Sequence, residues 1–322
     1  MTDLSRTLAM AFHPHRVEVA EMRQRLHGPK DLYLRSVDIA SDWMCEGSGR
    51  IVNRSVLSHG ITRKIDHRSF AFRRRLVLVI PSALCFIRTI EAPAWRGGSP
   101  NTWIEGDVRE YLPCDPADLV VSVAPCGLGA DGRGIALLVA CKRNDLTPYI
   151  EIASHLIGEI RLVIPACIAR WNGIHAGLRP ESRGVVVLAH AEGGSVDACM
   201  WQGERLLAIQ SGVLMSAQSE VDLLQRDPKA WIDKLLHQSV SGRSGTQGID
   251  DLVPQRVIVR GVQCPNLSDT PESRSIRALC TAPHVRVLEA DDRCFDQSGS
   301  YDATLGALLT VHTRANGRLE RV

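Results

Sequence analysis

The sequence lacks the long hydrophobic runs that mark membrane-spanning and secreted proteins. No apolar stretch among the 322 residues approaches the ~18–20 residues of a transmembrane helix. The N-terminus carries Asp3 and Arg6 in place of the hydrophobic block of a signal peptide, so we expect a cytosolic protein. Neither sign of charge is in excess, because 38 Lys and Arg balance 36 Asp and Glu. This balance predicts no nucleic-acid partner, and any contact with an anionic membrane would need a local basic patch.

Several motifs of catalytic and metal sites are also absent. None of the five lysines stands in a GxxxxGK[ST] phosphate loop, and neither the GxSxG turn nor the HExxH zinc motif occurs. The ten cysteines are scattered without a C-x-x-C pair, and four of them lie in apolar runs: Cys85, Cys141, Cys167 and Cys199. This pattern predicts buried, reduced thiols rather than metal ligands or disulfides.

One literal motif match fails in its context. Residues 127–132 (GLGADG) have the spacing of a dinucleotide-binding fingerprint, which requires the glycines to open a helix. Here residues 135–141 (IALLVAC) read as a strand. A hairpin that joins this strand to another at 119–124 is the better interpretation.

The apolar pattern of the first half predicts strands followed by alternating helices and strands. Strands are expected at 7–12, 16–23 and 31–39, and the run 76–93 predicts two more, broken at Pro81-Ser82. Residues 41–60 look irregular. Helices are expected where apolar residues share one face, at 101–112 (with Trp103 and Tyr111), 144–158 and 165–177, and a strand is expected at 159–164.

The second half repeats the opening of the first. Three strands are expected at 184–191, 195–201 and 205–211, and two later ones at 256–261 and 285–290. Helices are expected at 217–225, 228–240 and 300–314. Each half thus predicts a mixed sheet covered by helices, and we expect an α/β fold with a domain boundary near residues 178–183.

Two stretches resemble the actin-like PilM family, cytoplasmic proteins of the type IV pilus inner-membrane platform related to FtsA and to the cytoplasmic domain of GspL. The resemblance rests on Pro81-Ser82 at a strand end, IRTIEAP at 87–93 and EYLPCDPADLV at 110–120, with looser matches at 257–269 and 300–309. It implies a duplicated actin-like (ribonuclease H-like) fold. Its expected parts are a first domain at 1–180, a small inserted subdomain at about 77–143, and a reduced second domain at 181–322.

The resemblance also indicates where a nucleotide would bind, and this chain lacks the residues for it. In the actin-like superfamily two Asp-x-Gly hairpins hold the phosphates and their Mg²⁺. The matching positions form a degenerate cleft: Ala11 and Ala189 replace the aspartates, His13 replaces a glycine, His15 lies in the first turn, Gly193, Gly194 and Ser195 form the second, and Gly261 alone remains of the adenosine-contacting glycines. Without either carboxylate, we expect no cofactor, no metal and no catalytic residue.

Three alternatives stay open. His13 and His15 read as turn-exposed histidines, although protonated imidazoles would also attract an anion. Asp197, Asp222 or Glu192 would supply a relocated carboxylate if the chain were a nucleotide-binding ATPase or a kinase-like enzyme. The run Arg73, Arg74 and Arg75 reads as a solvated connection or as a contact for anionic lipid.

The leading hypothesis is a non-catalytic scaffold, peripheral at the inner membrane, in a type IV pilus or type II secretion machine. The resemblance implies that its partner is the N-terminal cytoplasmic tail of a bitopic inner-membrane protein. We expect a groove for that tail beside five residues: Leu84, Phe86, Arg88, Trp103 and Tyr111.

Overall fold

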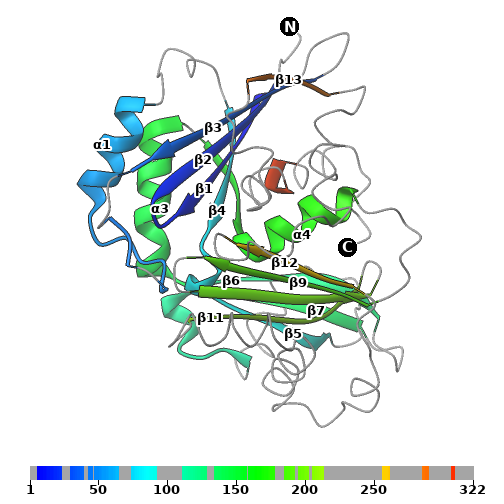
Figure 1. Ribbon diagram of the computed structural model, residues 1–322. Coiled ribbons are helices and arrows are strands. Elements are labelled where there is room, and N and C mark those ends of the chain that lie inside the picture. The colour runs from blue at the N-terminus through cyan, green and yellow to red at the C-terminus, as the bar shows by residue number, and fades with distance from the viewer. Residues whose placement is uncertain are drawn as a thin grey trace, which may run out of the picture.

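The computed structural model contains three β-sheets with helices packed on and between them (Figure 1). The structure describes residues 6–23, 30–39, 43–45, 47–64, 74–92, 111–128, 134–157, 159–177, 185–192, 195–202, 205–213, 256–261, 285–289 and 306–308.

The first and largest sheet, called the large sheet, has the strand order β13-β3-β2-β1-β4-β8. Its strands are β1 (Arg6–His13), β2 (Arg16–Arg23), β3 (Lys30–Asp38), β4 (Arg74–Ile80), β8 (Glu159–Pro165) and β13 (Val285–Glu289). β1, β2 and β3 form an antiparallel meander, whereas β4 pairs in parallel with β1, and β8 with β4. β13 pairs in parallel with β3, so a strand from late in the chain joins the sheet that opens it.

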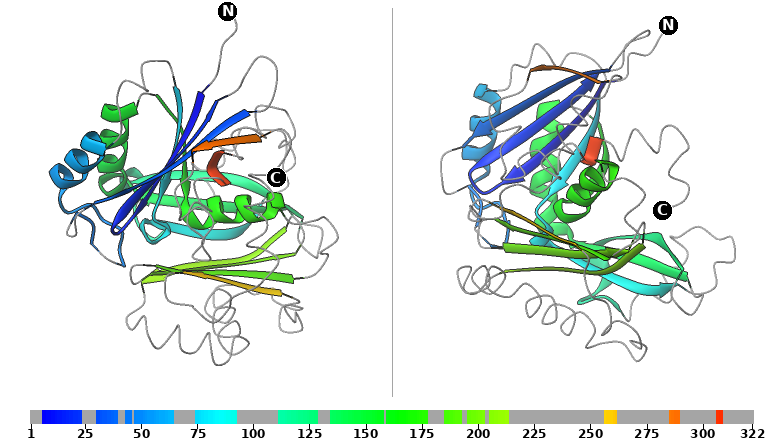
Figure 2. Two further views of the ribbon diagram at one scale, coloured as in Figure 1. Left: turned by 45° about the horizontal axis from the view of Figure 1, so that its top comes forward. Right: turned by 45° about the vertical axis from the view of Figure 1, so that its right-hand side comes forward.

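Helices cover both faces of the large sheet. α1 (Arg54–Lys64) and α3 (Arg143–Ile157) lie on one face, and α4 (Ala166–Gly177) lies on the other with residues 306–308 (Figures 1 and 2). Because successive residues of a strand point to opposite faces, β1 sends its bulky side chains toward α1 and α3. Its small Ala9 and Ala11 side chains lie in the core on the α4 side.

The small sheet is formed by the chain that runs between β4 and α3. It comprises β5 (Cys85–Ala92), β7 (Gly134–Lys142) and β6 (Leu119–Leu128), in the order β5-β7-β6 and all antiparallel. β4 ends at Ile80, and the 3₁₀ turn η2 (Ser82–Leu84) follows Pro81, which confirms the predicted strand break. The hairpin of β6 and β7 is also confirmed, so the glycines at 127–132 do not open a helix.

The second sheet repeats the plan of the first. β9 (Val185–Glu192), β10 (Ser195–Gln202), β11 (Arg205–Val213) and β12 (Arg256–Gly261) have the order β11-β10-β9-β12. An antiparallel meander again has a parallel strand beside its first member, as in β3-β2-β1-β4 of the large sheet. The duplicated α/β architecture expected from the sequence is therefore confirmed.

An apolar cluster joins the second sheet to α4 and to the small sheet. The Trp171 ring of α4 stacks on the Trp201 ring of β10, with centroids 4.3 Å apart and planes 7° from parallel. Leu137 of β7 and Ile209 of β11 pack in the same cluster. Burial of four large apolar side chains makes this a substantial contact between the two halves of the fold.

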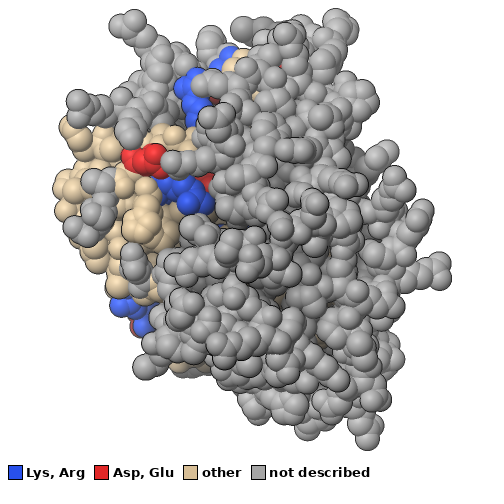
Figure 3. Space-filling model, in the orientation of Figure 1, with Lys and Arg blue, Asp and Glu red and all other residues tan. Residues whose placement is uncertain are grey.

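Charged side chains are mixed on the surface over α1 and α3. Arg54 Nη1 lies 2.6 Å from Glu151 Oε2, and Arg50 Nε lies 3.2 Å from Asp145 Oδ1. Acidic and basic side chains lie side by side on the left of the molecule, over the part that α1 and α3 occupy (Figure 3). Exposed pairs of this kind contribute little to stability.

One expectation is corrected by the structure, and several others concern residues that the structure does not describe. Residues 41–60 are not irregular throughout, because α1 begins at Arg54. The helices expected at 101–112, 217–225 and 228–240 lie outside the described residues, apart from Tyr111 and Leu112, and so does the predicted boundary at 178–183. Of the closing helix, only residues 306–308 are described.

Candidate functional site

The ends of several parallel strands open onto one pocket between the large sheet and the second sheet. β1, β4 and β8 all run toward it, and their last residues lead into the turn after His13, the η2 turn and helix α4. In open α/β sheets ligands bind at this end of the strands. The pocket that the described residues line has a volume of about 40 Å³.

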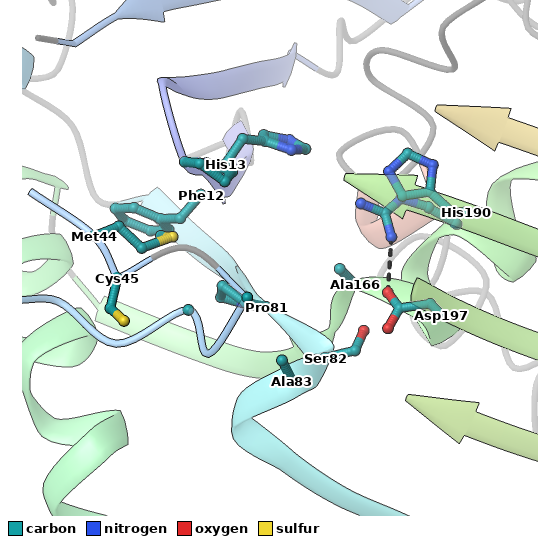
Figure 4. Close-up of a pocket in the computed structure, with 14 residues that line it drawn as sticks. Phe12, His13, Met44, Cys45, Pro81, Ser82, Ala83, Ala166, His190 and Asp197 are labelled. Carbon is teal, nitrogen blue, oxygen red and sulfur yellow. Dashed lines mark hydrogen bonds and ion pairs between the residues drawn. The ribbon is translucent and has the colours of Figure 1, made fainter. Parts of the chain in front are cut away.

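The first side of the pocket is built around a buried carboxylate on β2. His13 lies on this side, and its imidazole extends toward His190 and Asp197 on the other side (Figure 4). His13 Nε2 lies 3.2 Å from Glu18 Oε2, and Arg16 Nε donates to Glu18 Oε1 at 3.0 Å. Glu18 pairs directly with Ala11 across the hairpin and is 1% exposed. Buried charges of this kind need such partners.

This arrangement corrects one expectation about the hairpin. His13 is the last residue of β1 and is 5% exposed, so it is not a turn-exposed histidine. The turn consists of Pro14 and His15, and His15 is exposed as expected. The position that the resemblance matches to a glycine is thus filled by an imidazole that points into the pocket.

The opposite side of the pocket is held by an ion pair between α4 and β10. Arg170 Nη1 donates to Asp197 Oδ2 at 3.0 Å, and both side chains are less than one tenth exposed. Asp197 is the direct cross-strand partner of His190 on β9, so both side chains reach the pocket from one face of the second sheet. The ion pair links the two halves of the fold across the pocket.

The beginning of α4 and a glycine-rich loop complete the pocket. The amide of Cys167, in the first turn of α4, donates to Ser82 Oγ at 2.9 Å. Gly49 has φ +70°, and a Cβ there would lie 2.6 Å from the Cβ of Pro81. The Tyr149 hydroxyl donates to the Gly49 carbonyl. Only glycine fits this close approach of the loop to Pro81.

The remaining predicted cleft residues lie on the expected strands. Ala11 is buried in β1, Ala189 lies in β9, Ser195 begins β10, and Gly261 ends β12. Gly193 and Gly194 lie outside the described residues. In the parallel register of β12 and β9, Gly261 pairs with Ala191 beside the second hairpin.

The residues that the structure describes at this pocket do not fit a magnesium nucleotide. Mg²⁺ in phosphate-transfer sites is held by one or two carboxylates together with phosphate oxygens. The two carboxylates that the structure describes here, Glu18 and Asp197, are each held by a cationic side chain. Among the described residues, no group of three or more His, Cys, Asp or Glu side chains is arranged to hold a metal ion.

The five expected partner-binding residues do not all lie together. Phe86, Arg88 and Tyr111 meet at the small sheet, where the Arg88 guanidinium lies 5.9 Å from the centroid of the Tyr111 ring. Leu84 is 8% exposed and belongs to the main core instead, so it is not a surface residue of the small sheet. Trp103 lies outside the described residues.

Sequence reasoning missed Arg170 and Glu18 as residues of the cleft. Glu18 stands in a strand whose residues 17–22 are all buried, and a charge in such a strand is a signal of a paired buried group. Arg170 carries no comparable signal, because an arginine in a helix is ordinarily solvated. Asp197 was considered only as a relocated metal ligand.

None of the described helices is both long enough and apolar enough to cross a membrane.

Comparison with known proteins finds similarity in structure only. No family model matches the sequence, and no curated protein does either. A chain of the PilM-PilN type IV pilus biogenesis complex aligns with a TM-score of 0.64 and 13% identity, over 94% of this chain and 97% of that chain.

Two other solved structures align less closely. A Bacteroides thetaiotaomicron protein with an actin-like ATPase fold has a TM-score of 0.42 and 9% identity, over 86% of this chain and 98% of that one. The cytoplasmic domain of EpsL, an inner-membrane component of the type II secretion system of Vibrio cholerae, has a TM-score of 0.41 and 14% identity, over 70% and 79% of the two chains. The actin-like fold of the PilM type, expected from the sequence, is confirmed by the first match.

Proposed function

We propose that this chain is a non-catalytic cytoplasmic scaffold, peripheral at the inner membrane, in a type IV pilus or type II secretion machine. The observation that carries the proposal is the ion pair between Arg170 and Asp197, 3.0 Å apart at the place where the resemblance puts the nucleotide phosphates. With His13 opposite and alanine at both aspartate positions, the cleft is occupied by the protein's own side chains. On this proposal the chain neither binds nor hydrolyses ATP, and it acts by holding other proteins of the machine together.

The partner on this proposal is the N-terminal cytoplasmic tail of a bitopic inner-membrane protein. The similarity to a chain of the PilM-PilN complex over nearly the whole length supports this class of partner. The small sheet supplies a suitable surface, since Phe86 and Tyr111 are half-buried beside Arg88. Aromatic rings and an arginine beside them are the residue types that most often carry binding energy at protein interfaces.

The test is recovery of a partner from detergent-solubilised membranes. Wild-type protein should recover a small inner-membrane protein with one transmembrane segment, and the double variant Arg88→Glu, Tyr111→Ala should lose it. The matched control is Arg54→Glu, which reverses one exposed charge on α1, away from the small sheet. Equal recovery by the wild type, the control and the double variant would count against the small sheet as the binding surface.

A nucleotide-dependent enzyme of the same fold is the alternative, and one observation favours it. Asp197 does lie in the pocket, as a relocated metal ligand would. Its carboxylate is paired with Arg170, however, so metal binding would first have to break a buried ion pair. Of the other two candidates, Asp222 and the side chain of Glu192 lie outside the described residues. Titration with Mg·ATP separates the two functions.

A further inference from the structure

Two cysteines face each other where the chain enters and leaves the small sheet. Cys85 is the first residue of β5, and Cys141 is the last residue but one of β7. They are direct partners in the antiparallel register. Such partners have Cα atoms ~4.5–5.5 Å apart and side chains on the same face of the sheet. A disulfide spans Cα separations of ~4.4–6.8 Å.

The two thiols already interact. The Cys141 thiol donates to the Lys142 carbonyl at 3.7 Å, and a hydrogen bond between the two thiols raises the pKa of Cys85 and lowers the pKa of Cys141. The lowered pKa increases the fraction of Cys141 present as thiolate, the form that reacts with oxidants. Cys141 is 5% exposed and Cys85 is half-buried, so the pair is accessible to a small oxidant rather than to a bulky one.

We propose that Cys85 and Cys141 form a redox modification site, which a hydroperoxide converts from two thiols to a disulfide at the base of the small sheet. The Cys141 thiolate attacks the hydroperoxide, forms a sulfenic acid and releases the reduced oxygen as water or an alcohol. The Cys85 sulfur then attacks the sulfenic sulfur, the S–S bond forms, and a second water leaves. The hydroperoxide is reduced by two electrons, and the two thiols together lose two hydrogens.

The disulfide would close a covalent ring around the whole small sheet. β5, β6 and β7 all lie between the two cysteines in the sequence, so the bond would fix the chain where the small sheet meets the main core. In the cytosol such a bond would be transient, because the compartment keeps thiols reduced. The inference does not depend on the proposed function.

Peptide mapping tests the pairing directly. Trypsin places Cys85 in peptide 76–88 and Cys141 in peptide 134–142, each with no other cysteine. Folded protein is treated with hydrogen peroxide, unfolded in iodoacetamide, digested and analysed by mass spectrometry. The expected product is a cross-link between these two peptides, with two hydrogens lost, which a dithiol reductant reverses.

Variants give a second readout. In Cys85→Ser the Cys141 sulfenic acid has no partner and should be trapped by a 1,3-dione reagent on peptide 134–142. Cys45→Ser removes an exposed thiol elsewhere and should leave the cross-link unchanged. The proposal is overturned if Cys85 and Cys141 are both alkylated after peroxide treatment that oxidises Cys45, or if Cys141 is joined to peptide 162–170, which contains Cys167.

Discussion

At the scale of single residues, Arg170 and Asp197 form the buried ion pair that bounds one side of the pocket. Each side chain is less than one tenth exposed, so each charge has exchanged water for the other. Removing one partner of such a pair leaves an uncompensated buried charge, whereas replacing both by apolar groups is often nearly neutral. The pair is therefore expected to fix how the two halves meet more than to add stability.

This asymmetry gives a prediction for a double-mutant cycle. Arg170→Met should lower the free energy of unfolding by about 3–5 kcal/mol, because it strands the Asp197 carboxylate. The double variant Arg170→Met, Asp197→Leu should recover most of that loss. Urea unfolding of the wild type and the three variants measures both effects. If the unfolding free energy of the double variant is lowered by the sum of the two single-variant losses, the two residues are not coupled.

The buried thiols predict a loss of stability at alkaline pH. Burial raises the pKa of Cys199 to about 12 and raises the pKa of Cys167 as well. A thiol in the unfolded chain ionises near pH ~8.5, so above that pH the unfolded chain loses a proton that the folded protein keeps. The stabilisation from each thiol is thus complete below about pH 8.5 and is lost as the pH rises toward the folded value.

Urea unfolding near neutral pH and at about pH 10, in reductant, measures this loss. Cys199→Ala should reduce the fall in unfolding free energy between the two pH values by about 2 kcal/mol. Cys45→Ala should not change the fall, because that thiol is exposed in the folded protein. The interpretation fails if the unfolding free energy of both variants falls with pH as steeply as that of the wild type.

At the residue level, the sequence indicated which strands border the cleft, but not which side chains meet in it. Ala11 and Ala189 could be placed because the strands before the two hairpins are strongly patterned. The side chains that fill the cleft could not, since Arg170 meets Asp197 only when α4 packs against β10. Long-range pairs of this kind leave no mark on local periodicity.

At the scale of elements, most strands were predictable and one helix was not. The strands of both meanders are apolar runs bounded by polar turns, which is a strong signal. α1 has a weaker one, with Leu57 and Ile61 as its buried residues one helical turn apart. Its first turn is capped by Asn53, whose Oδ1 accepts from the Val56 amide at 3.3 Å. That capping residue was the signal that could have placed the helix.

The sheet membership of β13 was not predictable for a different reason. The five residues of β13 show the pattern of a strand, but a pattern this short does not indicate which strand it pairs with. It pairs with β3, far away in the sequence, although the pattern of duplication suggests a place among later strands.

The first strands of the large sheet give a prediction about membranes. Arg6 pairs with Arg23 and with Arg74 at the end of the sheet opposite the pocket, and Arg75 next to them is exposed. Basic residues near an anionic surface contribute about 1 kcal/mol each. We expect the protein to bind vesicles that contain phosphatidylserine, and to be released as salt is raised.

Sedimentation with vesicles compares the charge-reversed variant with a matched control. Replacing Arg73, Arg74 and Arg75 by Glu should weaken binding at least about tenfold, whereas Arg54→Glu, on α1, should not. Binding that is insensitive to salt, or equally strong in the triple variant, would remove this basic end of the sheet as a lipid contact.

At the scale of the whole molecule, the fold is a duplicated plan of two meanders with a small pocket between them. The β3-β2-β1-β4 order recurs as β11-β10-β9-β12, and the stacked rings of Trp171 and Trp201 hold the halves together. The duplication could be predicted because each half begins with the same strand pattern. The side chains of the pocket could not be predicted, because local patterns do not show which residues of α4 and β10 come together.

Calorimetric titration of the reduced protein with Mg·ATP tests the closed cleft most directly. The account predicts no heat of binding beyond that of dilution at millimolar nucleotide, because the Asp197 carboxylate in the pocket is already paired with Arg170. A binding isotherm with a micromolar dissociation constant, lost in Asp197→Ala, would contradict it and establish a nucleotide site.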